Sequence, residues 1–262
     1  AAREPALAVV YGRRRCGKSR LLQQLEPERT AYFLADQSDQ ALQRQALAAT
    51  LTLLFPGFAA ANYPSWQAFF EALTTRPAAP GRRLFTLILD EFPNLAAGYP
   101  ALPSLLQTLI DRGALRMHLV LCGSSQRMMA GLVLNASAPL FGRAGEILKI
   151  RPLPPGWIME ALRVKGAAAV EQYALWGGVP RYWELAANFD SPELALHDLV
   201  LHRDGVLHQE PRRLLQDDLR TDTQPHSLLA VLGSGVHRLS EIGARLEKPA
   251  INLLRPLDIL IE

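Results

Sequence analysis

Residues 12–19 hold two glycines, a lysine and a serine at a spacing that suits the binding of phosphate groups. They read G-x-x-x-x-G-K-S without a gap, after an apolar run at residues 7–10 with the length and composition of a buried strand. Glycines let the backbone curl so that successive N–H groups face phosphate oxygens, and a following helix would add its positive end. Lys18 would reach the β- and γ-phosphates, and the Ser19 hydroxyl would ligate Mg²⁺.

The pattern therefore predicts a site for a nucleoside triphosphate, with ATP or ADP and Mg²⁺ as cofactors. A strand–turn–helix that carries these residue types by chance is the alternative, and the apolar strand before the loop argues against it. The residues expected to bind the nucleotide here are Gly12, Arg13, Arg14, Arg15, Cys16, Gly17, Lys18, Ser19 and Arg20.

Two adjacent carboxylates end another apolar run. Residues 84–89 are mostly apolar and lead into Asp90 and Glu91, which is typical of a buried parallel strand with chemistry at its carboxyl end. Asp90 would hold the magnesium shell, directly or through water, and Glu91 would orient or deprotonate the attacking water. An acidic strand end without a catalytic role is the alternative. The position downstream of the phosphate loop favours catalysis.

Three more polar residues adjoin the later apolar runs. Ser124 and Ser125 follow the run at residues 117–122, where a hydroxyl would either sense the γ-phosphate or cap a helix at residues 126–132; both interpretations stay open. Arg143 precedes the strand expected at residues 144–150. We expect it to contact phosphate in the same chain or in a neighbouring copy, with an exposed solubilising arginine as the alternative.

Composition places few limits on function. The formal net charge of the 262 residues is +3, which is too small to indicate nucleic acid binding. Cys16 and Cys122 are the only cysteines, so no disulfide framework is expected and a cytoplasmic location is predicted. No run of 18 apolar residues occurs, so we expect no membrane partner. The chain starts close to the first strand and stops inside a helical pattern, and we expect both ends to be trimmed from something longer.

The apolar runs alternate with helical patterns, which predicts an α/β fold with a parallel sheet of five strands flanked by helices. The expected strands are at residues 7–10, 30–34, 84–89, 117–122 and 144–150, with a turn-rich loop at residues 77–83. A proline-rich stretch at residues 151–155 marks a boundary. We therefore expect a core at residues 1–152, a helical lid and linker at 153–224, and a smaller helical unit at 225–262.

The expected C-terminal unit has two short helices joined by a tight turn, like a helix-turn-helix. Its candidate recognition helix carries Arg255 but no other Lys or Arg, so the electrostatic footprint of DNA binding is missing. DNA is a possible partner at these helices, and a protein partner is also possible.

Taken in order, the motifs at residues 11–19, 89–92, 123–125, 140–143 and 176–182 resemble those of the archaeal-type P-loop ATPases. These are relatives of the AAA+ and STAND regulatory ATPases. The more specific marks are the arginines after the first glycine and the Gly-Gly-x-Pro-Arg-Tyr turn at residues 177–182. The resemblance implies an ASCE-type, AAA+-like P-loop NTPase fold, a helical lid and a winged helix, here partial because no wing strands are expected. The family's usual segment bordering the adenine is missing.

The resemblance also implies that the lid turn, with Gly177, Gly178 and Pro180, approaches the nucleotide; a plain helix–helix connector is the alternative.

The predicted function is slow Mg-dependent ATP hydrolysis in a nucleotide-controlled conformational switch. The residues expected to act in catalysis are Lys18, Glu91, Ser125 and Arg143, and those expected to hold the metal are Ser19 and Asp90. A nucleotide-loaded regulatory or DNA-binding module that does not hydrolyse ATP is one alternative. A small-molecule phosphotransferase is another, and the adjacent carboxylates, which suit water activation, argue against it.

Overall fold

A computed structural model of the protein describes residues 4–75, 84–218 and 223–261. The turn-rich loop predicted at residues 77–83 lies outside the described residues. The chain divides into two compact units, Ala1–Ala187 and Asn188–Glu262.

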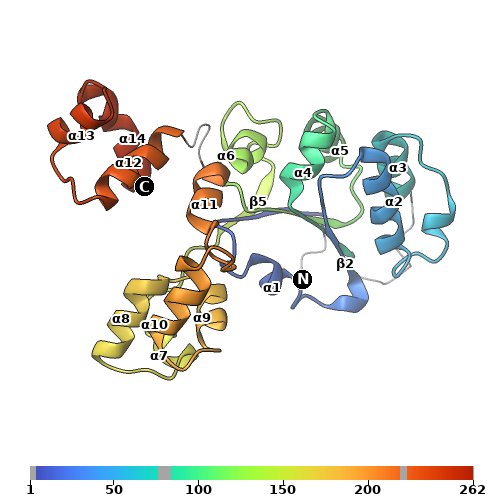
Figure 1. Ribbon diagram of the computed structural model, residues 1–262. Helices are drawn as coiled ribbons and strands as arrows, with labels where there is room; N and C mark the ends of the chain where they lie inside the picture. Colours follow the sequence, from blue (N-terminus) through green and yellow to red (C-terminus); the bar gives the residue numbers. More distant parts are fainter. Residues whose placement is uncertain (1–3, 76–83, 219–222, 262) are drawn as a thin grey trace. The chain divides into compact units, whose positions relative to one another are not determined.

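A five-stranded parallel sheet forms the centre of the first unit (Figure 1). Its strands are β1 (Leu7–Tyr11), β2 (Thr30–Leu34), β3 (Thr86–Asp90), β4 (His118–Gly123) and β5 (Ala144–Lys149). They lie in the order β2-β3-β4-β1-β5, and every neighbouring pair is parallel. The predicted α/β fold is therefore confirmed, and β4 lies between β1 and β3.

Most helices of the first unit cover one face of this sheet (Figure 1). They are α2 (Gln40–Leu51), α3 (Trp66–Thr74), α4 (Phe92–Gly98), α5 (Leu102–Asp111) and α6 (Gln126–Met129), with short 3-10 turns at Pro27–Arg29 and Phe58–Ala60 and a π-helical turn at Ala130–Leu134. Because side chains alternate along a strand, Val9, Phe33, Leu87, Leu89 and Leu121 face these helices in the main core.

The opposite face of the sheet carries α1 (Lys18–Leu22), the helix that follows the phosphate loop. Its Leu22 packs with Val10, Ile88, Val120 and Cys122 in a second, smaller core. The sheet is therefore buried on both faces near its centre, as expected for parallel strands made of near-continuous apolar runs.

Three helices of the segment predicted to form a lid, α7 (Gly156–Ala161), α8 (Ala167–Trp176) and α9 (Pro180–Ala186), also belong to the first unit. The N–H of Leu153 donates a 2.7 Å hydrogen bond to the carbonyl of Gly178, and the Tyr173 hydroxyl donates to the carbonyl of Leu153. Arg20 of α1 forms an ion pair of 2.9 Å with Glu184 of α9. These contacts join the three helices to the compact unit that ends at Ala187; the predicted division into a core at residues 1–152 and a lid and linker at 153–224 stays a prediction.

The described elements of the second unit are all helices or helical turns. It contains α10 (Pro192–Leu196), a π-helical turn (His197–Leu201), α11 (Glu210–Asp218), α12 (Thr223–Gly233), α13 (Leu239–Arg245) and α14 (Ile251–Ile261). The last three helices pack around Leu228, Val236, Ile242 and Leu253. The unit begins at Asn188 rather than at residue 225, and its identification as a partial winged helix stays a prediction. In the described part of the chain, no helix has the length and apolarity needed to span a membrane.

The α8–α9 turn predicts a stability effect, because Gly178 has no room for a side chain. A Cβ atom there would lie 2.1 Å from the carbonyl oxygen of Leu153 and 2.7 Å from its nitrogen. We expect Gly178→Ala to push the turn away from Leu153 and to lower the free energy of unfolding by about 1–3 kcal/mol, the range for overpacking. Urea unfolding measures the change. Gly156→Ala is the matched control, since a Cβ there meets open space, and equal midpoints for both variants would contradict the expectation.

Candidate nucleotide and metal site

The phosphate loop, residues 12–19, leaves the carboxyl end of β1 in a curled conformation. Gly12, Arg15 and Gly17 have φ angles of 145°, 63° and 92°, all in the region that favours glycine. A Cβ at Gly12 would lie 2.0 Å from the carbonyl oxygen of Ile150, whereas one at Gly17 would enter open space. Left-handed residues interspersed with ordinary ones turn backbone N–H groups toward a common centre, which is how an anion-binding concavity forms.

Lys18 places a buried positive charge in this curl. Its side chain is only 4% exposed, and its Nζ donates hydrogen bonds of 2.8 Å to the carbonyl oxygens of Gly12 and Arg13. Both of these partners are neutral. Burying an ammonium group without an opposite charge is costly, so the loop is electrostatically suited to an anion.

Asp90 ends β3 and is almost fully buried. Its Oδ2 accepts hydrogen bonds from the Ser19 hydroxyl, at 2.6 Å, and from the Tyr32 hydroxyl, while Oδ1 accepts from the N–H of Glu91. Burial by itself would raise the pKa of Asp90, but hydrogen bonds from Cys122, Ser19 and Tyr32 outweigh it and lower the pKa. Asp90 is therefore a carboxylate, and the structure brings it to Ser19 as the sequence predicts.

The donor set at this point fits Mg²⁺, which prefers oxygen ligands and keeps several waters besides one or two carboxylates and substrate phosphates. Ser19 and Asp90 supply a hydroxyl and a carboxylate. Among the described residues, no group of three or more His, Cys, Asp or Glu is arranged to hold a metal ion. A metal at Asp90 would therefore take its remaining ligands from phosphate and water.

Glu91 is held in a strained conformation next to the end of β4. Its φ of 51° is left-handed, which costs a residue other than glycine about 1–3 kcal/mol. The two carboxylate oxygens accept hydrogen bonds from the hydroxyl and, at 3.3 Å, from the N–H of Ser124. The carboxylate is thus fixed at the sheet edge that carries Asp90.

The two serines after β4 have different roles in the structure. The Ser125 hydroxyl accepts a hydrogen bond from the N–H of Met128 and caps α6, so the capping interpretation is confirmed. The strand-end hydroxyl that reaches Glu91 belongs to Ser124. Phosphate sensing by Ser125 stays a prediction.

Arg143 lies at the amino-terminal end of the parallel strands, opposite the end that carries the phosphate loop. It precedes Ala144, which pairs with Leu7 at the start of β1, whereas the phosphate loop follows the end of that strand. The five residues of β1 span about 16 Å at roughly 3.3 Å per residue, and the guanidinium binds both carboxylate oxygens of Asp111 at 2.7 and 2.8 Å. The phosphate contact expected within the same chain is therefore wrong, and a contact with a neighbouring copy stays a prediction.

The remaining residues predicted for the nucleotide lie around the loop. Arg13 and Arg14 are exposed and Arg15 is half-buried. Burial raises the pKa of the Cys16 thiol against the lowering effect of the nearby Lys18 and Arg13 charges, so the thiol is neutral near pH 7. The Arg20 side chain pairs with Glu184 of the lid.

Pro180 is the first residue of α9, the helix that Arg20 connects to α1. The approach of Gly177, Gly178 and Pro180 to the nucleotide stays a prediction. The positive end expected from α1 belongs to a helix of five residues. Tyr32 and Cys122, two donors to Asp90, were not predicted. Their only sequence signal is a polar side chain on an expected strand, and the strand order that places both strands beside β3 comes from the structure.

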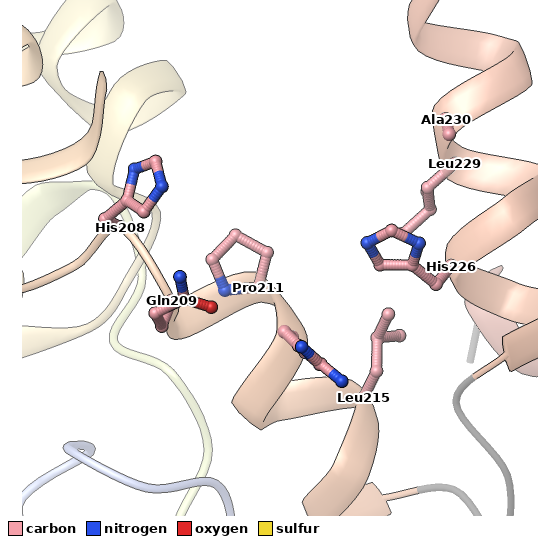
Figure 2. Close-up of a pocket in the computed structure, with 8 residues that line it drawn as sticks. His208, Gln209, Pro211, Leu215, His226, Leu229 and Ala230 are labelled. Carbon is pink, nitrogen blue, oxygen red and sulfur yellow. The ribbon is translucent and has the colours of Figure 1, made fainter. Parts of the chain in front are cut away.

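The second unit has a separate cleft of about 350 Å³ between α11 and α12. Figure 2 shows Pro211 and Leu215 of α11 facing Leu229 and His226 of α12, with His208 near the start of α11. None of the residues predicted to bind nucleotide lines this cleft, so the site in the first unit is the candidate for the nucleotide.

The cap at α6 predicts a stability effect for Ser125→Ala. Loss of the acceptor for the Met128 N–H should lower the free energy of unfolding by about 1 kcal/mol, the usual cost of removing a serine cap. Ser65→Ala is the matched variant, because Ser65 caps α3 in the same way through the N–H of Ala68. Thermal unfolding of both proteins compares them. A midpoint lowered by Ser65→Ala but not by Ser125→Ala would show that the α6 cap contributes nothing.

Comparison with known proteins adds three findings. Residues 4–154 match the family model described as an AAA domain. An uncharacterized protein of Methanocaldococcus jannaschii is 30% identical over 239 residues, which are 89% of this chain and 51% of that protein. The chain therefore spans about half the length of this curated relative.

Solved structures of the Aeropyrum pernix ORC2 protein share the fold. The ADP form has a TM-score of 0.55 at 15% identity, and the match covers 93% of this chain and 73% of the ORC2 chain. The structure of the ADPNP and ADP complexes has a TM-score of 0.53 at 14% identity, with 92% and 73% covered. With the family match extending over more than half of the sequence, the chain belongs to the AAA+ P-loop ATPases.

Proposed function

We propose that the chain binds ATP with Mg²⁺ at the phosphate loop and hydrolyses it slowly, as a nucleotide-controlled conformational switch. The observation that carries the proposal is the Lys18 ammonium, buried in a curled loop and hydrogen-bonded to neutral carbonyl oxygens. The family match and the ADP and ADPNP complexes of the ORC2 protein support this class of ligand.

The loop residues have complementary roles in this proposal. Lys18 exchanges its two carbonyl partners for the β- and γ-phosphate oxygens, which gives its buried charge an opposite charge. Ser19 and Asp90, already joined at 2.6 Å, would hold Mg²⁺. Bound there, the metal supplies charge neutralisation on the β- and γ-phosphates.

Glu91 is the proposed general base. Its carboxylate lies one residue beyond Asp90, and the hydrogen bonds from Ser124 orient it. A carboxylate placed in this way accepts a proton from a water molecule in line with the γ-phosphate. Ser124 links this carboxylate to β4, and phosphate sensing by Ser125 stays a prediction.

The lid supplies the switch. The ion pair between Arg20 and Glu184 connects the helix after the phosphate loop with α9, and Arg181 shares the same carboxylate. Exposed pairs of this kind contribute little stability, so they rearrange at small cost. A nucleotide shifts the lid only to the extent that it binds one arrangement more tightly than the other.

Location and partners complete the proposal. The free cysteines Cys16 and Cys122 support a reducing, cytoplasmic setting. The three helices at residues 223–261 pack around their own core, and the proposal keeps a protein or DNA as their partner, although Arg255 is the single Lys or Arg of α14.

The role of Lys18 predicts a loss of binding. Lys18→Ala removes the charge that the loop offers to phosphate, so the affinity for a fluorescent ATP analogue with Mg²⁺ should fall by about 100-fold or more, as two charge-assisted hydrogen bonds are lost. Lys18→Arg is a second variant that keeps the charge but not the compact shape, and it should also bind weakly. Lys165→Ala changes an exposed lysine and is the control. Wild-type affinity in Lys18→Ala would refute the proposed site.

The role of Glu91 predicts a separation of binding from turnover. Glu91→Gln keeps the size of the side chain but removes the base, so the analogue should bind within about twofold of wild type while single-turnover phosphate release slows by about 10²–10⁴-fold. Glu71→Gln, on the exposed side of α3, should leave both unchanged. If wild-type protein binds ATP but releases no phosphate, the chain is instead the non-hydrolysing module.

A further inference from the structure

Asp90 receives more hydrogen bonds than the proposed function uses. Its donors are the Ser19 hydroxyl, the Glu91 N–H, the Tyr32 hydroxyl and the Cys122 thiol. An ionised carboxylate offers about four lone-pair positions, and these donors fix the orientation of the Asp90 carboxylate. The first donor, Ser19, belongs to the phosphate loop, and the second, Glu91, is the residue after Asp90. Tyr32 and Cys122 come from the strands on either side of β3 and have no role so far.

The register of the sheet explains how Tyr32 reaches Asp90. Tyr32 pairs with Ile88 across β2 and β3, and Asp90 lies two residues beyond Ile88, on the same face. The phenol ring packs against the small core that contains Ile88 and Val10. Its length carries the hydroxyl along the sheet toward the carboxyl edge, where it donates to Oδ2, the oxygen that also accepts from Ser19.

The Tyr32 hydroxyl is a dependable donor in this position. A phenol hydroxyl carries a proton that it can donate to a carboxylate oxygen, and it makes this contact at Oδ2 of Asp90. A thiol is a weaker donor than a hydroxyl, and Cys122 therefore restrains the carboxylate less. Of the two flanking donors, Tyr32 has the greater influence on the direction of the Oδ2 lone pairs.

We propose that Tyr32 is a positioning residue for the metal: its hydroxyl holds Asp90 against Ser19, so that the carboxylate and hydroxyl are in place before Mg²⁺ arrives. This inference rests on the proposed function, because it concerns the same nucleotide and metal. Partners that orient a metal-binding carboxylate change metal affinity by 10–100-fold when they are removed. Tyr32 does not touch the nucleotide in this proposal, so its removal affects the metal-dependent part of binding alone.

Tyr32→Phe tests the proposal, because it removes the hydroxyl and keeps the packed ring. The affinity for a fluorescent ATP analogue is measured with Mg²⁺ and with EDTA, and the ratio of the two affinities reports the contribution of the metal. We expect this ratio to fall about tenfold, or to one, in Tyr32→Phe, with the affinity in EDTA unchanged. Tyr63→Phe is the matched control, since the Tyr63 hydroxyl donates to the carbonyl of Phe58, in the other core, and it should keep the wild-type ratio.

The other outcomes separate this inference from the function on which it rests. A wild-type ratio in Tyr32→Phe would overturn the role of Tyr32 and leave the proposed ATP site intact. An equal loss of affinity in Mg²⁺ and in EDTA would show a general structural role, which also overturns it. If wild-type protein itself shows no Mg²⁺-dependent binding, the proposed function fails, and that result is visible before any variant is made.

Discussion

The insertion of β4 between β1 and β3 is the constraint on which the site depends. It separates the start of the phosphate loop from Asp90 by two strand spacings, about 10 Å at roughly 4.8 Å each. Helix α1 lies over the face with the smaller core and brings Ser19 back to Asp90 at 2.6 Å. The loop and the carboxylate thus meet through a side chain of α1, while Ser124, just after β4, holds Glu91 at the same end of the sheet.

This arrangement keeps opposite charges apart within one buried site. The hydrogen bonds of the Lys18 ammonium go to carbonyl oxygens, and those of Asp90 come from hydroxyl, thiol and N–H groups. Dipoles therefore compensate each charge in the described structure. A polyphosphate with a bound metal carries a negative part for the lysine and a positive part for the carboxylate, so it complements both at once.

Two residues with unusual backbone geometry lie at the same site, at the carboxyl ends of the strands. Gly12 has no space for a side chain because the carbonyl of Ile150 lies where a Cβ would be, and Glu91 has a left-handed conformation. Hydrogen bonds from Ser124 hold the Glu91 carboxylate in spite of the strain in its backbone. Strained residues persist only where their surroundings over-determine them. Of the described left-handed residues other than glycine, Arg15 and Glu91 lie at this site, whereas Arg163 and Glu247 lie elsewhere.

The sequence by itself determined the local features: the phosphate loop, the apolar strands and the carboxylate pair at residues 90–91. Each is a contiguous segment whose spacing has a direct physical meaning. Only the tertiary structure decided that Tyr32 reaches Asp90, that Ser124 reaches Glu91, and that helices α7 to α9 belong to the first compact unit. The structure also placed Arg143 at the amino-terminal end of the strands, away from the phosphate loop. These contacts depend on strand order and register, and the order along the chain does not reveal that β4 lies between β1 and β3.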